Sequence, residues 1–284
     1  MPDLIMHINY FERGYPLSYA FDKAIEHGFD GIEVRGFSRD GLESDDYLDT
    51  VEAEIERTNI PNVTMSLNAN FMVSDPEKRD EELERWTHVL KRGADMGVET
   101  FNAFTGSLAV EGIDPLKFDR NGSGCATADH WNWAVDAYKA LGAVADDVGA
   151  RLAFETHNNY LHDLATPARK LVDMINSPAV GVNLDMGNIV LNDNGEPLEE
   201  ALDILEGKIY YLHIKNMFLP RGGGFVPVHI SDGVIDNRVM FRILMEQGYD
   251  GPVGLEAPRQ GDRDYFAEQD IAYIKSVCED LGWE

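Results

Sequence analysis

The sequence predicts an α/β protein, a single domain in which eight strands and eight helices alternate as a (β/α)₈ barrel. Short apolar segments alternate with longer amphipathic ones along the whole chain, which is the pattern of repeated βαβ units. The length of 284 residues, 44% of them hydrophobic, suits one such barrel, which typically needs about 250 residues. No low-complexity tract or flexible linker divides the chain, so we expect one domain over 1–284. An open doubly wound sheet is the competing architecture.

The apolar runs set the expected order of elements. We expect strands at 4–10, 31–35, 62–68, 98–104, 151–156, 180–185, 209–215 and 252–257. We expect helices at about 16–27, 44–59, 76–96, 128–149, 166–176, 198–206, 236–247 and 264–281. Glycines that need positive φ should end several of these helices, namely Gly28, Gly97, Gly149 and Gly248. Two N-caps with a proline in the first turn are expected at Asp75–Pro76 and Thr166–Pro167.

The charge of the chain is strongly acidic. Asp and Glu number 51 against 24 Lys and Arg, which gives a formal net charge of −27. Such a surface repels nucleic acid and anionic membranes, so neither is expected as a partner. The acids lie among apolar residues at helical spacing, which is typical of solvated helix faces. We interpret this composition as adaptation to a high-salt cytoplasm, in which case the protein should unfold when salt is removed.

Other features bear on location and redox chemistry. The N-terminal MPDLIMHINYF has no signal-peptide pattern, and no window approaches the roughly 18 apolar residues of a membrane span, so we expect a cytoplasmic protein. The two cysteines, Cys125 and Cys278, show no metal-binding spacing and are expected to be ordinary thiols.

Four residues at the ends of successive predicted strands point to a metal centre. Active sites of barrel enzymes lie at the C-terminal ends of the strands, where Glu155, Asp185, His213 and Glu256 are found. Three carboxylates and an imidazole that converge need a counter-charge, which a divalent cation supplies. This donor set suits one Mn²⁺, Co²⁺, Mg²⁺ or Fe²⁺, with Zn²⁺ a further option. The alternative is that these are separate strand-end residues with local hydrogen bonds.

The same residues carry a family resemblance. The motifs FETHNNY, VNLDMGN, YYLHIKN and GLEAP resemble the xylose isomerase-like superfamily of TIM barrels, and within it the ketose 3-epimerase branch. The resemblance implies that the four residues above are metal ligands and that Glu155 and Glu256 form the catalytic acid/base pair. A metal-dependent sugar isomerase or epimerase would abstract the proton α to a carbonyl and stabilise the resulting enediolate on the metal.

Several polar residues are expected to bind a small sugar substrate. His157 follows Glu155 by two residues, and Lys215 shares the strand face of His213. Asn188 stands where many relatives have a histidine, which argues against a centre with several metals. The remaining candidates lie at strand ends or in the glycine-rich loop after the seventh strand: His7, Glu33, Arg221 and His229. Asn68 and Asn102 are further strand-end candidates for distal hydroxyls.

Aromatic residues and one long loop are candidates for covering the site. An apolar wall or lid would draw on Tyr10, Phe11, Phe37, Phe71 and Phe104, for which core packing or dimer contacts are the alternative. Residues 105–127 form a long segment that is expected to cover the site or an interface. We also expect a homo-oligomer, either a dimer or a tetramer.

Three other functions compete with the isomerase. A keto-inositol dehydratase would use the same proton abstraction, followed by loss of hydroxide. An apurinic endonuclease of the same superfamily is disfavoured by the acidic charge, by Asn188, and by Pro227 where an Asp-x-His pair ending at His229 would need an aspartate. A sugar-binding barrel without catalysis is disfavoured by the two retained glutamates.

Overall fold

The strands of the protein form a closed parallel barrel. The computed structural model describes residues 1–39, 41–256 and 259–283. Eight strands follow the order β1-β10-β7-β6-β5-β4-β3-β2, and an additional two-stranded sheet joins β8 to β9. The predicted TIM barrel is therefore confirmed. Among the described residues, no helix has the length and apolar character needed to cross a membrane.

The residues group into two compact units, Met1–Thr64 with Leu212–Glu284, and Met65–Tyr211. The single-domain organisation stays a prediction, and each unit is described by itself. The first unit contains β1 (Leu4–His7), α1 (Leu17–Glu26), β2 (Gly31–Arg35), α2 (Ser44–Thr58), β8 (Asn216–Phe218), β9 (Val226–Val228), α8 (Asn237–Glu246), β10 (Val253–Leu255) and α9 (Arg263–Leu281). The second contains α3 (Pro76–Asp95), β4 (Thr100–Ala103), α4 (Ala128–Val148), β5 (Arg151–Glu155), α5 (Ala165–Ile175), β6 (Val180–Asp185), α6 (Met186–Ile189) and α7 (Leu198–Leu205). Two strands, β3 (Asn62–Leu67) and β7 (Ile209–Ile214), include the points where one unit passes into the other.

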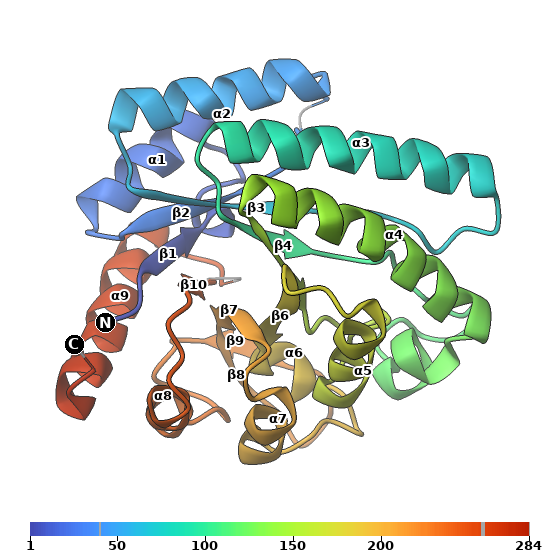
Figure 1. The fold of residues 1–284 in the computed structure, drawn as a ribbon. Helices are drawn as coiled ribbons and strands as arrows, with labels where there is room; N and C mark the ends of the chain where they lie inside the picture. The colour runs from blue at the N-terminus through green and yellow to red at the C-terminus, as the bar shows by residue number, and fades with distance from the viewer. Residues whose placement is uncertain (40, 257–258, 284) are drawn as a thin grey trace. The chain divides into compact units, whose positions relative to one another are not determined.

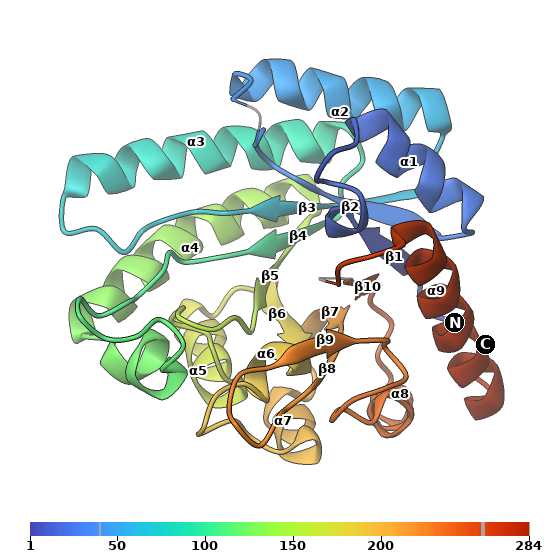
Figure 2. The ribbon, with the colours of Figure 1, turned by 180° about the vertical axis from the view of Figure 1, so that it is seen from behind.

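Apolar burial explains where the strands form. In the first unit, Met6 of β1 pairs in register with Ile32 of β2 and Leu255 of β10, and all three side chains are fully buried. Strands buried on both faces are expected to be mainly apolar, which holds for β1 and β10, whereas β2 also carries Glu33 and Arg35. Helices pack next to one another outside the strands, α1 against α2 in the first unit and α3 against α4 in the second (Figures 1 and 2).

Strand register also places the polar residues. His7 of β1 pairs with Glu33 of β2, and His213 of β7 pairs with Gly254 of β10. In the second unit, Glu155 of β5 pairs with Asn183 of β6. His7, Glu155 and His213 lie at or next to the C-terminal ends of their strands, which is where barrel enzymes carry their active sites.

Most boundaries agree with the predicted ones to within two residues, but the first strand does not. It ends at His7, and residues Ile8–Tyr10 form a 3₁₀ turn, because the His7 Nδ1 atom accepts a hydrogen bond from the Asn9 amide at 3.0 Å. The last predicted strand is also shorter, and its residue 257 lies outside the described residues. All four predicted glycines adopt positive φ, as expected: Gly28, Gly97, Gly149 and Gly248.

Two local predictions were wrong. Asp75 does cap α3 by accepting from the Glu77 amide, but Thr166 is not the N-cap of α5. That helix begins at Ala165, and the carboxylate of Glu196 accepts from the backbone amides of residues 165 and 166. The glycine-rich loop was predicted to lack regular structure, yet it contains the antiparallel pair β8 and β9.

The long segment 105–127 is held together from within. The residue that connects its parts is Asn121, which is fully buried. The Asn121 side chain accepts from the Val110 amide at 2.9 Å and donates to the carbonyls of Asp114 and Lys117. Because one side chain satisfies backbone groups on three parts of the loop, the segment is compact despite its length.

Candidate active site

Two acidic residues, at the ends of β5 and β6, are oriented by amides. Glu155 is 4% exposed and Asp185 is fully buried. The Asn188 side chain donates to both, at 3.0 Å to Glu155 Oε1 and 2.9 Å to Asp185 Oδ2. Asn102 donates to the other Glu155 oxygen at 3.0 Å. Amide donors orient a carboxylate without neutralising it, so these contacts preserve its negative charge.

The chain around these acids reinforces their positions. Asp185 is the N-cap of the short helix α6, and its Oδ1 accepts from the Asn188 backbone amide at 3.1 Å. Asn188 thus contacts Asp185 through both its backbone and its side chain. Asn183 extends the network by donating to Asn102 Oδ1 at 3.1 Å. The carboxylates are therefore held by a buried polar network in which each link restricts the next.

His162 supports this group and was missed by the sequence analysis. Its ring is fully buried, with Nδ1 against the Glu155 carbonyl and Nε2 accepting from the Thr105 amide at 3.3 Å. Burial lowers the pKa of His162 to about 4, so the imidazole is neutral at pH 7. The proton then resides on Nδ1, which lets the ring link the end of β5 to the start of the long segment 105–127.

A histidine and a carboxylate form a buried pair in the other unit. His213 Nε2 and Glu33 Oε2 are 2.7 Å apart, and neither side chain is exposed. If Nε2 donates to Glu33, Nδ1 is the unprotonated nitrogen, the one suited to coordinate a metal. Carboxylate-to-histidine pairs of this kind commonly orient metal-bound imidazoles and raise their basicity.

Glu256 has charged and polar neighbours. Lys215 Nζ lies 2.7 Å from Glu256 Oε2, and Asn9 donates to Oε1 at 3.2 Å. His7 Nε2 is 3.6 Å from the same Oε1. The Glu256 side chain is 11% exposed, so it is largely shielded from solvent.

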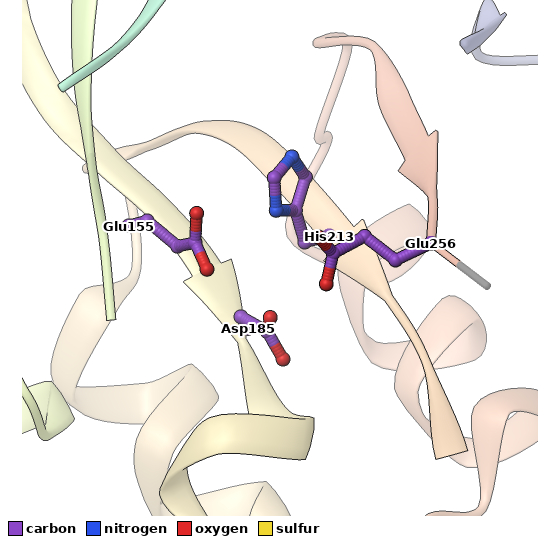
Figure 3. A group of neighbouring side chains, drawn as sticks. All are labelled: Glu155, Asp185, His213 and Glu256. Carbon is purple, nitrogen blue, oxygen red and sulfur yellow. The ribbon is translucent and has the colours of Figure 1, made fainter. Parts of the chain in front are cut away.

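The four predicted ligands form one group. One ligand atom from each of Glu155, Asp185, His213 and Glu256 lies within 4.8 Å of every other (Figure 3). Three carboxylate oxygens and an imidazole nitrogen are a donor set that divalent cations of intermediate hardness accept. The protein therefore contains a largely buried cluster of Glu, Asp and His that could hold a metal ion.

A family model described as xylose isomerase-like TIM barrel matches residues 21–277. The chain belongs to this family. The chain is 24% identical over 250 residues to an L-ribulose-5-phosphate 3-epimerase from Shigella boydii, covering 85% of this chain and 82% of that protein. It is 26% identical over 146 residues to an inosose dehydratase from Clostridium perfringens, covering 45% of this chain and 48% of the relative. That match therefore spans about half the length of the dehydratase.

Solved structures share the fold. A xylose isomerase-like TIM barrel protein from Mycobacterium smegmatis, in complex with magnesium, superposes with a TM-score of 0.76 at 19% identity, covering 99% of this chain and 98% of that one. At this identity the likeness establishes the family fold and leaves the chemistry to the residues of the site.

The remaining predicted substrate residues have different surroundings. The strand β5 ends at Glu155, so His157 does not continue its face as predicted; its ring contacts Phe104 and Tyr160 edge-on. Arg221 is exposed in the loop between β8 and β9. His229 Nε2 lies 3.3 Å from the buried carboxylate of Asp270.

The aromatic residues proposed as a wall divide into two groups. Tyr10, Phe11 and Phe71 are fully buried, so they pack in the core and do not form a mobile lid. Phe104 is 7% exposed and packs against His157, while Phe37 is half-buried. Both cysteines are free, as predicted.

Proposed function

We propose that this protein is a sugar isomerase or epimerase that uses one divalent cation and abstracts a proton next to a carbonyl. The group formed by Glu155, Asp185, His213 and Glu256 carries the proposal. The match to an epimerase over most of both chains supports it. A cation bound there would polarise the substrate carbonyl and stabilise an enediolate.

The residues of the chain supply the proton transfers. Glu155 and Glu256 are the proposed acid/base pair, and each is positioned by neighbours. Asn188 and Asn102 fix both oxygens of Glu155, whereas Lys215 and Asn9 fix those of Glu256. A base whose rotamer is fixed removes a proton without first reorganising.

The substrate contacts are assigned by the same reasoning. We propose that His7, Lys215 and Asn188 donate to sugar oxygens, because each has a polar group next to a proposed acid/base or ligand carboxylate. Glu33 acts through His213. His157, Arg221 and His229 stay predictions as substrate contacts, as do the homo-oligomeric state and the cytoplasmic location.

Dehydration is the second candidate. The inosose dehydratase relatives favour it, since a β-hydroxyl can leave after the same proton abstraction. Proton return to the substrate gives an isomer or epimer, whereas departure of hydroxide gives the dehydrated ketone. The difference therefore lies in which group faces the second carboxylate.

An exchange experiment separates the two. The metal-loaded protein is incubated in D₂O with ketoses, aldoses and keto-inositols, and the products are analysed by mass spectrometry and NMR. Deuterium at the α carbon without loss of water supports isomerisation or epimerisation, while loss of water supports the dehydratase. Absence of exchange with every sugar would overturn both.

A substitution tests the assigned base. Glu256→Gln keeps the size of the side chain but removes its charge, so both metal affinity and turnover should fall, with turnover decreasing by about 10²–10⁴-fold. Glu268→Gln, on the exposed face of α9, is the control and should behave like the wild type. Unchanged turnover in Glu256→Gln would remove Glu256 from the mechanism.

A further inference from the structure

A cavity lies where the chain leaves β1 and β2. Its volume is about 280 Å³, and none of the four proposed metal ligands is among its described lining residues. Most of its wall comes from aromatic and aliphatic side chains in the segments after these strands and at the starts of α1 and α2. The bulkiest of them are Phe11, Tyr15, Phe37, Leu42 and Tyr47.

Among the described lining residues, three carry a charge: Glu12, Arg35 and Arg39. Glu12 pairs with Arg35 through both carboxylate oxygens, one contact being Arg35 Nη2 to Oε2 at 3.0 Å. The same carboxylate also forms an ion pair with Arg39, with Nη1 2.9 Å from Glu12 Oε2. Among the described lining residues, two guanidinium groups therefore share one carboxylate. This excess of positive charge occurs in a chain whose net charge is −27.

The positive charge is incompletely compensated. Burial and the neighbouring guanidinium of Arg35 lower the pKa of Arg39, and the charge of Arg13 acts in the same direction. The Arg39 side chain is 44% exposed. In its ion pair with Glu12 it uses one of the five N–H donors of a guanidinium group, so other donors are available for a ligand. A bound anion would relieve the repulsion between the guanidinium groups.

Strand β2 links the cavity to the proposed active site. Arg35 follows Glu33 by two residues on β2, so both side chains leave the same face of the strand. Burial lowers the pKa of Arg35, but the hydrogen bond to Glu12 and the charges of Glu12, Glu33 and Glu256 together raise it above its ordinary value. Glu33 in turn contacts His213. A ligand at Arg35 and Arg39 would therefore lie close along β2 to Glu33, the residue that contacts the proposed ligand His213.

We propose that this cavity, lined by Glu12, Arg35 and Arg39, binds an anionic group at the distal end of the sugar substrate, either a phosphate or a carboxylate. The inference rests on the proposed function, because it names the class of sugar that the site would accept. Guanidinium groups bind both anions through charge-assisted hydrogen bonds, and the apolar wall would pack against the carbon chain.

Binding of inorganic phosphate tests the cavity without requiring turnover. Isothermal titration of the metal-loaded protein is carried out at constant ionic strength with the wild type, Arg39→Gln and Arg85→Gln. Arg85 is an exposed arginine of α3 and serves as the control. Arg39→Gln should weaken binding about tenfold or more, as expected when a charged donor is lost, and Arg85→Gln should not. Phosphate that binds at the metal would contribute equally to the wild type and to both variants, so it would not produce a difference between them. Equal phosphate affinities of the three proteins would overturn the proposal.

Kinetics identify the anion. KM is measured for a ketose phosphate, a keto sugar acid and a neutral ketose in the same variants, with Arg39→Lys as a charge-preserving variant. An increase in KM for the phosphate or for the acid in Arg39→Gln, largely reversed in Arg39→Lys, supports the corresponding anion. An equal increase for the neutral ketose would overturn the proposal. If no sugar turns over but Arg39→Gln loses phosphate binding, the proposed function fails and the anion site stands.

Discussion

The two groups of proposed ligands are held in different ways. Asn188 and Asn102 reach the carboxylates at the ends of β5 and β6, and both are neutral amides. The other two proposed ligands have charged or titratable partners. Glu33 contacts His213, and Lys215 contacts Glu256. Amides fix geometry and leave charge unchanged, whereas charged partners also influence protonation. We infer that Asn188 and Asn102 set the positions of Glu155 and Asp185, while Glu33 and Lys215 also act on His213 and Glu256 through their charges.

Removing one negative charge from the amide-held pair should have the largest effect. Asp185→Asn retains an oxygen that can accept from the Asn188 amide, so the cap of α6 is preserved while the charge is lost. Metal content should fall well below one ion per chain, and turnover should decrease by about 10²–10⁴-fold. Metal analysis after dialysis and steady-state kinetics measure the two quantities.

The control for this change is another aspartate at a helix N-cap. Asp75 caps α3 by accepting from the Glu77 amide at 3.1 Å. Asp75→Asn makes the same chemical change in the same local motif, so any loss shared by both variants reflects capping and not metal binding. Full metal content in Asp185→Asn would exclude Asp185 as a ligand.

A smaller effect is expected in the charged group. Glu33→Gln keeps an oxygen that can accept from His213 Nε2 but removes the carboxylate charge that supports the imidazole. Loss of such a partner typically costs 10–100-fold in metal affinity or activity. Titration with Mn²⁺ and measurement of kcat provide the comparison, with the exposed Glu268→Gln as the control. If Glu33→Gln binds metal like the wild type, Glu33 does not act through His213.

Most strand boundaries and the four proposed ligands could be predicted from the sequence because buried strands have a recognisable apolar pattern. Strands such as β2 and β6 were predicted at their observed boundaries because most of their residues are apolar, as expected for strands covered on both faces. The four proposed ligands were found because they interrupt or end such runs. An acidic residue at the end of a buried strand is costly unless it has a role, so its position is informative.

The rest depends on contacts between distant parts of the chain. His162 lies in a loop whose sequence has no periodic pattern. It supports the site by accepting a hydrogen bond from the Thr105 amide, which is 57 residues earlier in the chain. Glu196 caps α5 from 30 residues away, which no local motif could indicate. The pair β8 and β9 was missed because Pro227 and the run of glycines argue against a strand, although an edge position tolerates proline.

Asp163 is a buried acid outside the group of four proposed ligands. Asp163, in the loop before α5, is 1% exposed, and its Oδ2 accepts from the Ser123 amide at 3.0 Å. Burial raises the pKa of Asp163 to about 6, and the hydrogen bond from Ser123 offsets only part of this effect. A buried carboxylate with a neutral backbone donor thus gains affinity for a proton, while the carboxylates of the cluster are placed to bind a cation.

This difference gives the smallest and most specific prediction. Because the pKa of Asp163 is raised from its ordinary value of 3.8 to about 6, the folded state binds the proton more tightly than the unfolded state does. The contribution is therefore fully present below pH 3.8 and is lost as the pH rises through about 6, with a total of about 3 kcal/mol. Asp163→Asn is neutral at every pH and should escape this loss.

Denaturant unfolding between pH 4 and 7 measures the effect. The variant should have a free energy of unfolding at pH 7 that exceeds that of the wild type by about 1–3 kcal/mol, with the difference shrinking towards pH 4. Asp203→Asn, at an exposed position of α7, is the control. Its free energy of unfolding should change with pH in the same way as that of the wild type. Parallel curves for Asp163→Asn would mean that Asp163 is charged throughout this range, and burial alone would then not explain why the acids of the cluster need a cation.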